Sequence, residues 1–323
     1  PLVPPHGRRH WRERGGNDNN NALEAKTMFI DIHIHIARIS DIGWRKGEDG
    51  PASPEQFIEM YDEAGVDMGV MLPLTIPECN ALTQSNEDIL MIAEEYPDRF
   101  IPFCNIDPRL SNNSPEFDFS WVLEHYKEKG CRGIGEMTAN LWWDDPRVTN
   151  LLDHAERVGM PMTFHVATRD GGMYGLIDEY GLPRLEKQVA DHPNMIFLAH
   201  SNPWWSYISG DVTQETWGGY PKGPVTEGGR IPEMLRRYPN LHGDMSAGSG
   251  FNAISRDPEF GYAFLEEFQD QLLWGTDICR PSNRSDMLVY LKDFLEDALA
   301  KDKISQTVFD KVTHKNAQRV LGL

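Results

Sequence analysis

Eight short apolar runs recur along this chain, and each is followed by a longer stretch in which apolar residues fall at helical spacing. This alternation constrains the fold more than any other feature. Strands that are apolar at nearly every position are typical of a parallel sheet that is buried on both faces. The expected strands are 29–36, 68–74, 100–107, 133–137, 161–167, 195–201, 241–247 and 271–277.

Capping residues support the helices between these strands. Ser53 stands where an N-cap is expected, and Gly130 and Gly159 stand where two helices would end. The expected helices are 54–64, 121–129, 150–158, 285–299 and 305–321.

Eight strand–helix units favour a (β/α)8 TIM barrel over a doubly wound parallel sheet. A doubly wound nucleotide-binding sheet would place a glycine-rich phosphate loop after its first strand. Here Ala37-Arg38-Ile39-Ser40 follows instead, without a Gly-x-Gly sequence. We therefore expect one barrel domain over residues 28–323, with its active site at the C-terminal ends of the strands.

Residues 1–27 differ from the rest of the chain, since they combine a cluster of arginines with a run of asparagines. They contain no apolar segment of the kind found in secretory signals. Met28 stands directly before the first strand and resembles a natural start. We expect residues 1–27 to be a tag or a disordered tail.

The overall charge excludes some classes of partner. The formal net charge is -19, which argues against nucleic acid and anionic membranes. No apolar run approaches the ~20 residues that cross a bilayer. The four cysteines include no Cys-x-x-Cys pair, so we expect reduced thiols in a cytoplasmic protein.

Two histidines lie one residue apart in the first expected strand. Residues at i and i+2 of a strand point to the same side, so His33 and His35 should project together from an apolar element. Burying two imidazoles side by side is costly unless a partner satisfies both. A divalent metal is one such partner, and backbone hydrogen bonds to two core histidines are the alternative.

Other expected strands also end in residues that bind metals. Glu136, His165, His200 and Asp277 each stand near the end of an apolar run. Each has a structural alternative when considered alone: Asp277 could cap a helix, for example, and Glu136 could pair with Arg132. Because all the strand ends of a barrel meet at one face, we expect these residues to converge there with the histidine pair.

The order Asp31-Ile32-His33-Ile34-His35, His165, His200 and Gly275-Thr276-Asp277 resembles the amidohydrolase superfamily. More narrowly, the chain resembles the amidohydrolase-related branch that includes aminocarboxymuconate-semialdehyde decarboxylase and its relatives. It implies that His33, His35, His165 and Asp277 hold a metal, most often Zn²⁺, with another divalent ion such as Mn²⁺ as the alternative. His200 would then be a second-metal ligand or the catalytic acid/base.

The superfamily's carboxylated lysine on the fourth strand is not evident in this chain. Glu136 stands at about that place and could bridge two metals instead; otherwise the site holds one metal. Arg230 corresponds to a position near the substrate in the decarboxylase branch.

Aromatic and basic residues after the strands suggest the pocket walls. Trp143, Trp204, Trp205 and Trp217 fall in expected loops, where they either line a pocket for a ring-containing molecule or pack the loops together. The long segment 202–229 is expected to cover the metal. Four arginines also follow expected strands, and one or two of them could bind a substrate carboxylate: Arg38, Arg45, Arg169 and Arg280.

The sequence favours a metal-dependent hydrolase of a small, ring-containing or carboxylate-bearing molecule, in which Asp277 and His200 are the catalytic residues. A non-oxidative decarboxylase of an aromatic or muconate-like acid is the alternative. A non-catalytic metal binder would not need both Asp277 and an open coordination position. We also expect a homo-oligomer, either a dimer or a tetramer.

Overall fold

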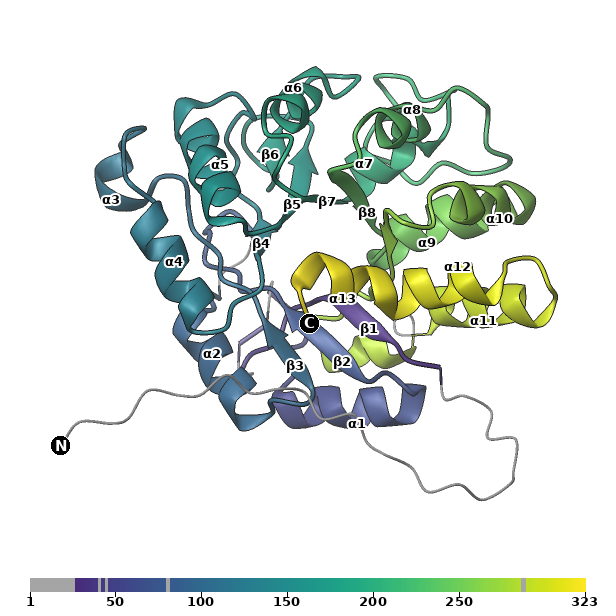
Figure 1. The fold of residues 1–323 in the computed structure, drawn as a ribbon, viewed down its shortest axis with the longest axis horizontal. Helices are drawn as coiled ribbons and strands as arrows, with labels where there is room; N and C mark the ends of the chain where they lie inside the picture. The colour runs from purple at the N-terminus through teal and green to yellow at the C-terminus, as the bar shows by residue number, and fades with distance from the viewer. Residues whose placement is uncertain (1–26, 40–41, 44–45, 80–81, 286–288) are drawn as a thin grey trace.

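Eight parallel strands stand at the centre of the molecule, and helices surround them (Figure 1). The computed structural model describes residues 27–323, apart from 40–41, 44–45, 80–81 and 286–288. The predicted tail, except for Thr27, lies outside the described residues. The central strands are β1 (Ile30–Ile34), β2 (Met68–Met71), β3 (Phe100–Pro102), β4 (Ile134–Met137), β5 (Met162–Ala167), β7 (Phe197–His200), β8 (Leu241–Asp244) and β9 (Leu272–Leu273).

Two backbone bridges close these strands into a ring. β1, β2 and β3 pair in parallel, and so do β4, β5, β7, β8 and β9. Cys104, just after β3, bridges Ile134 of β4, and Ile34 of β1 bridges Ile278, just after β9. The predicted (β/α)8 barrel is therefore confirmed. A short extra strand, β6 (Leu176–Ile177), pairs with β5 outside the ring and was not predicted.

Apolar side chains fix the position of β1, the strand that carries both histidines of the His-x-His motif. All five of its residues are buried. Ile30 and Ile32 belong to one apolar cluster, and Ile34 belongs to a second, larger one. Each fully buried isoleucine stabilises the fold by about 1.5–3 kcal/mol. A shift of one residue would place Asp31 and His33 where the isoleucines now pack. The burial of the isoleucines therefore also fixes the register of the strand.

The helices follow the strands as the sequence indicates, with different bounds in several places. They are α1 (Pro54–Ala64), α2 (Asn86–Glu95), α3 (Leu110–Asn113), α4 (Ser120–Glu128), α5 (Pro146–Val158), α6 (Pro183–Asp191), α7 (Asn202–Trp205), α8 (Arg230–Arg237), α9 (Ala247–Ser255), α10 (Pro258–Glu267), α11 (Tyr290–Ala300), α12 (Gln306–Asp310) and α13 (Asn316–Leu321).

Local capping explains where the predicted bounds differ. α5 begins at Pro146 rather than at residue 150 because the Asp145 carboxylate accepts a hydrogen bond from Arg147 N at 2.9 Å. α11 begins at Tyr290 because residues 281–285 form a separate 3-10 turn. The predicted helix over 305–321 exists as α12 and α13, joined by a π-helical turn at Lys311–Lys315.

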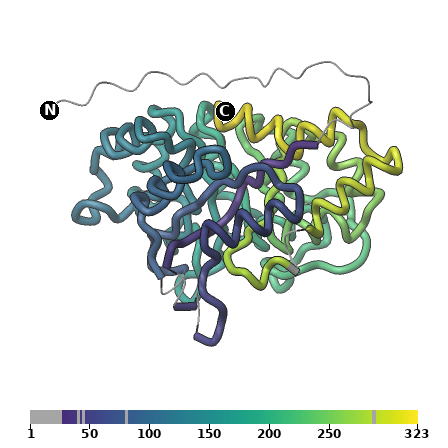
Figure 2. Tube along the Cα trace, turned by 90° about the horizontal axis from the view of Figure 1, so that it is seen from below, coloured from purple at the N-terminus to yellow at the C-terminus, as the bar shows by residue number. Residues whose placement is uncertain are grey.

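The loops after the strands gather at one end of the barrel. Figure 2 shows the C terminus at one end and the loop after β1 protruding at the opposite end. In the part of the chain that the structure describes, no helix is long and apolar enough to cross a membrane. No disulfide joins any of the four cysteines in the part of the chain that the structure describes.

Candidate metal centre

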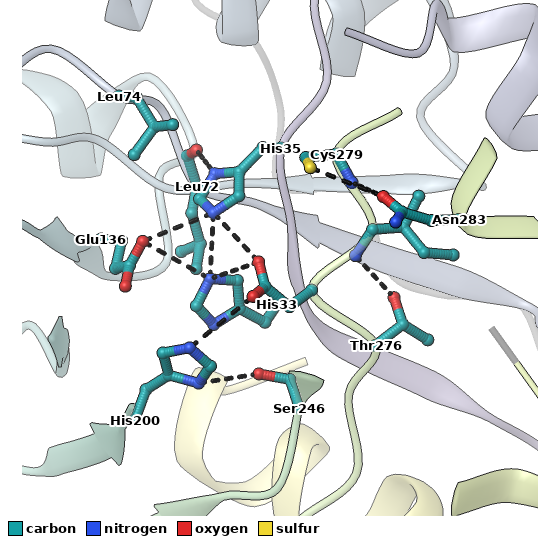
Figure 3. Close-up of polar contacts among 12 residues, drawn as sticks. His33, His35, Leu72, Leu74, Glu136, His200, Ser246, Thr276, Cys279 and Asn283 are labelled. Atoms are coloured by element: carbon teal, nitrogen blue, oxygen red, sulfur yellow. Dashed lines mark hydrogen bonds and ion pairs between the residues drawn. The ribbon is translucent and has the colours of Figure 1, made fainter. Parts of the chain in front are cut away.

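The two histidines of β1 meet at their Nε2 atoms. His33 Nε2 and His35 Nε2 lie 3.1 Å apart, and both side chains are buried (Figure 3). This confirms that the two rings project together, as their spacing predicted.

The other ring nitrogen of each histidine faces an acceptor. His33 Nδ1 lies 2.6 Å from Asp244 Oδ2, and His35 Nδ1 lies 2.8 Å from the carbonyl oxygen of Leu72. These acceptors favour the tautomer in which Nδ1 carries the hydrogen and donates it. The two neutral imidazoles would then point bare Nε2 lone pairs at each other, which is unfavourable without a cation between or beside them.

Two carboxylates face the same pair of nitrogen atoms. Glu136 Oε2 lies 3.4 Å from His35 Nε2 and 3.8 Å from His33 Nε2. Asp277 Oδ1 lies 3.4 Å and 3.6 Å from the same two atoms. Four ligand-type side chains from β1, β4 and the segment after β9 therefore converge on one place.

The electrostatics of this place favour positive charge. Burial opposes a charged imidazole at His33, but Asp244 and Asp277 outweigh it and raise the pKa well above its usual value. For His35, burial is likewise outweighed by Asp277 and Glu136, which raise the pKa to about 9. Burial would raise the pKa of Glu136, yet His33 and His35 hold it well below its usual value. A divalent cation bound here would satisfy the same carboxylates in place of protons.

One oxygen of Glu136 has no partner among the described residues. Oε2 faces the histidine pair, whereas Oε1 is buried and makes no hydrogen bond. A buried carboxylate oxygen without a partner carries a desolvation cost of a few kcal/mol. Glu136 Oε1 is therefore suited to bind a cation. This buried oxygen without a partner indicates that the donor set fits a metal.

His200, from β7, is oriented with its Nε2 toward the centre. Its Nδ1 lies 2.9 Å from Ser246 Oγ and 3.5 Å from Asp244 Oδ2. Its Nε2 lies 3.8 Å from Asp277 Oδ2. Figure 3 shows the His200 ring beside that of His33, and their centroids are 4.4 Å apart.

His165, from β5, stands next to His200. Their ring centroids are 5.8 Å apart, and His165 Nδ1 lies 3.1 Å from the carbonyl oxygen of Val166. Burial lowers the pKa of His165 to about 4, so its imidazole is neutral at pH 7. A neutral ring whose Nδ1 donates to a carbonyl leaves Nε2 available to a metal.

The described residues form two overlapping groups of metal-ligand atoms. One comprises His33, His35 and Asp277, the other His33, Glu136 and His200, and within each group the ligand atoms lie within 4.8 Å of one another. His33 Nδ1 is engaged by Asp244, so it offers one nitrogen to both groups. His165 belongs to neither group, but it lines the cavity that opens beside them.

A cavity of about 670 Å³ opens over these residues. His35, Glu136, His165, His200 and Asp277 form part of its wall. This volume suits a small organic molecule.

A sequence model of a protein family described as amidohydrolase matches residues 30–323. The chain belongs to the amidohydrolase family. No curated protein sequence matches it.

Solved structures share the barrel of this amidohydrolase. An uncharacterised TIM-barrel protein from Bordetella bronchiseptica is 19% identical, covering 91% of this chain and 98% of its own, with a TM-score of 0.58. The 5-carboxyvanillate decarboxylase of Sphingomonas paucimobilis is 18% identical, with coverages of 92% and 99% and a TM-score of 0.58. A probable 2-pyrone-4,6-dicarboxylic acid hydrolase of Acinetobacter baumannii is 14% identical, with coverages of 91% and 99% and a TM-score of 0.53. At these identities the similarity shows the fold alone.

Two buried aspartates of this amidohydrolase support the centre and were not predicted. Asp244 faces both His33 and His200. Asp31 accepts hydrogen bonds from the backbone N–H groups of His33 and Thr276, at 3.1 and 2.9 Å, and so joins β1 to the segment that carries Asp277. Burial raises the pKa of Asp31 to about 6. Asp244 ends β8 in the way the other ligand-type residues end their strands, so the same rule would have found it.

The predicted aromatic walls need a correction. Trp143, Trp204, Trp205 and Trp217 are not among the described residues that line the cavity. Trp143 packs edge-on against Phe164, and the buried Trp204 and Trp205 rings lie edge-on to each other. The indole of Trp205 donates to Asp244 O at 2.9 Å, and that of Trp217 donates to Pro203 O at 2.9 Å.

Other residues from the long segment do reach the cavity. Asn202, Pro203, Gly218 and Tyr220 line it, so part of the predicted covering segment 202–229 adjoins the centre. The indole N–H of Trp205 ties this segment to β8, whereas that of Trp217 makes its hydrogen bond within the segment.

Of the predicted substrate-binding arginines, Arg280 lines the cavity, Arg45 lies outside the described residues, and the others lie elsewhere. Arg38 forms a surface ion pair with Glu95 at 2.6 Å. Arg230, in α8, pairs with Glu233 at 2.8 Å and with Glu186. Neither is among the described residues that line the cavity.

Proposed function

We propose that this amidohydrolase is a metal-dependent hydrolase that cleaves an ester, amide or similar bond in a small molecule. The observation that carries the proposal is the pair of carboxylate oxygens of Glu136. Oε2 faces His33 and His35, and Oε1 is buried without a partner in the described chain. A carboxylate with its two oxygens in different surroundings is suited to bridge two cations.

The donor set suggests how two ions would be shared. His33, His35, Asp277 and Glu136 Oε2 would hold one, and Glu136 Oε1, His165 and His200 would hold the other. Nitrogen and carboxylate donors of this kind suit Zn²⁺, with Mn²⁺ as the alternative. When bound, such an ion polarises a carbonyl oxygen and lowers the pKa of water from ~15.7 toward ~7.

Asp277 is the residue proposed to move the proton. Partial burial opposes ionisation of Asp277, but His33 and His35 hold its pKa below the usual value, so Asp277 is ionised at neutral pH. Oδ2 of Asp277 lies 3.8 Å from His200 Nε2, and the residue lines the cavity. In the proposed reaction Asp277 accepts a proton from the attacking water and delivers it to the leaving group.

A second candidate function rests on how His200 is held. Ser246 and Asp244 both face Nδ1 of His200, an arrangement that also suits an imidazole that donates a proton from Nε2. In a decarboxylase, His200 would protonate the carbon that loses CO₂, and the centre would need a single metal.

Product analysis and metal analysis together distinguish the two. The purified protein would be assayed with 2-pyrone-4,6-dicarboxylate, a cyclic ester, and with 5-carboxyvanillate, an aromatic acid. Ring opening without CO₂ release, together with about two metal ions per chain, would support the hydrolase. Release of CO₂ by a protein that holds about one ion would overturn it in favour of the decarboxylase.

A further inference from the structure

Arg280 is the one Lys or Arg among the described residues that line the catalytic cavity. It follows Asp277 by three residues, so one short segment carries both a residue of the metal centre and a permanent positive charge into the same cavity. The carboxylates among the described residues that line the cavity belong to Glu48, Glu136 and Asp277.

A buried asparagine fixes the backbone from which Arg280 projects. Asn283 Oδ1 accepts hydrogen bonds from the backbone N–H groups of Cys279 and Arg280, at 3.1 and 3.2 Å. Asn283 N–H donates in turn to the carbonyl oxygen of Arg280 at 3.1 Å. Figure 3 shows Asn283 directed at Cys279. The backbone at Arg280, from which its side chain projects, is therefore held in a fixed position after β9.

Among the described residues, the guanidinium itself is only lightly engaged. Arg280 Nη1 lies 3.2 Å from Glu48 Oε2, and the two side chains are 32% and 34% exposed. An ion pair this exposed contributes little to stability. A guanidinium carries five N–H donors in a planar fork, so a single long contact leaves most of its capacity for another carboxylate.

We infer that Arg280 binds a carboxylate of the substrate and that Glu48 holds this place when no substrate is present. The inference rests on the proposed function, because it assumes that the reacting bond lies at the metal centre. Tyr174, Phe251 and Tyr290 also line the cavity, and their rings suit a planar ring in the ligand. The substrate class is therefore a cyclic ester or cyclic amide that carries a carboxylate away from the bond that is cleaved.

Binding of matched probes tests this without any turnover. Terephthalate and its monoamide have nearly the same shape and differ by one negative charge, and isophthalate and its monoamide form a second, shorter pair. Isothermal titration calorimetry of the zinc-loaded protein would give the affinity ratio of diacid to monoamide. We expect a ratio of about 10 or more for at least one pair, because a bidentate arginine–carboxylate contact is lost in the monoamide.

Three variants test whether Arg280 causes the affinity ratio of diacid to monoamide. In Arg280→Met the ratio should fall to about 1. In Glu48→Gln it should rise, because the competing carboxylate is removed. Arg284→Met is the matched control: Arg284 is four residues further along the same segment, pairs with Glu59 and Glu63, and does not line the cavity. That variant should keep the wild-type ratio.

Two outcomes would overturn the inference: a wild-type ratio near 1 for both probe pairs, or an unchanged ratio in Arg280→Met. If Arg280→Met fails to fold, as judged by circular dichroism, the rise expected in Glu48→Gln is decisive by itself, and its absence counts against Arg280. Because calorimetry needs no catalysis, an inactive protein that still discriminates the probes would contradict the proposed hydrolase and leave the carboxylate site standing.

Discussion

Asp244 Oδ2 lies 2.6 Å from Nδ1 of His33, and both side chains are completely buried. The same carboxylate oxygen lies 3.5 Å from Nδ1 of His200. One acidic residue at the end of β8 thus accepts a hydrogen bond from His33 of β1 and faces His200 of β7, whose Nδ1 lies closer to Ser246 Oγ. Its contact with His33 favours the tautomer that carries the hydrogen on Nδ1 and leaves Nε2 available.

Asp244→Asn should therefore weaken metal binding by about 10–100-fold while leaving every direct ligand in place. The amide removes the negative charge that favours Nδ1–H on His33. Competition with a chelator of known affinity measures the change. Asp178→Asn is a control for the loss of a buried carboxylate that does not face the centre, since Asp178 accepts a hydrogen bond from the backbone N–H of Leu185 in α6. An equal loss of metal in both variants would contradict the orienting role of Asp244.

Glu136→Gln should reduce the metal content from about two ions per chain to about one and abolish hydrolysis. The amide oxygen can still accept one contact, but the NH₂ group that replaces the second oxygen cannot bind a cation. Elemental analysis of the dialysed variant measures the content. Glu48→Gln serves as the control, because Glu48 lines the cavity but pairs with Arg280 instead of the histidines. Full metal content in Glu136→Gln would rule out the bridge.

Asp277→Asn should keep the fold and most of the metal but lower kcat/KM by about 10²–10⁴-fold. Asparagine can still offer an oxygen to a cation, whereas it cannot accept the proton of the attacking water. Steady-state kinetics on the metal-loaded variant, with the metal content measured in parallel, tests this role. Turnover within a few-fold of the wild type would remove Asp277 from proton transfer.

Periodicity and strand position predicted much of the centre. The side-by-side rings of His33 and His35 follow from the i, i+2 geometry of a strand, and Glu136 and Asp277 meet them because strand ends share one face of a barrel. Asp244 was within reach of the same rule. The expected strand ran to residue 247, however, whereas β8 ends at Asp244.

The cavity walls were not predictable in this way, because they depend on how side chains of loops pack against distant elements. Trp205 was expected in the pocket, yet its indole N–H finds a backbone acceptor at Asp244. Arg230 was expected near the substrate, yet it forms an ion pair with Glu186, 44 residues earlier in the chain. No local pattern marks such partners. Arg280 was one of four arginines expected after the strands, and it reaches the cavity through a turn that the side chain of Asn283 organises.

A buried histidine outside the centre predicts how stability depends on pH. His242, at the start of β8, is buried, and its Nδ1 has no hydrogen-bond partner among the described residues. Burial, helped by the nearby Arg319, lowers the pKa of His242 from 6.5 to about 4. As the pH falls, the unfolded chain therefore takes up this proton before the folded protein does. Stability that is fully present above pH 6.5 is lost as the pH falls toward about 4, by about 2–3 kcal/mol.

His242→Gln should remove that part of the pH dependence. Urea unfolding of the chelator-treated wild type and variant at pH 7.5 and at pH 4.5 gives four free energies of unfolding. Metal release does not contribute, because both proteins are already free of metal. The variant should be less stable than the wild type at pH 7.5, since a glutamine amide in this place is also buried. Between the two pH values, however, it should lose about 2 kcal/mol less than the wild type does. Equal losses in the two proteins would show that His242 does not remain neutral in the folded state.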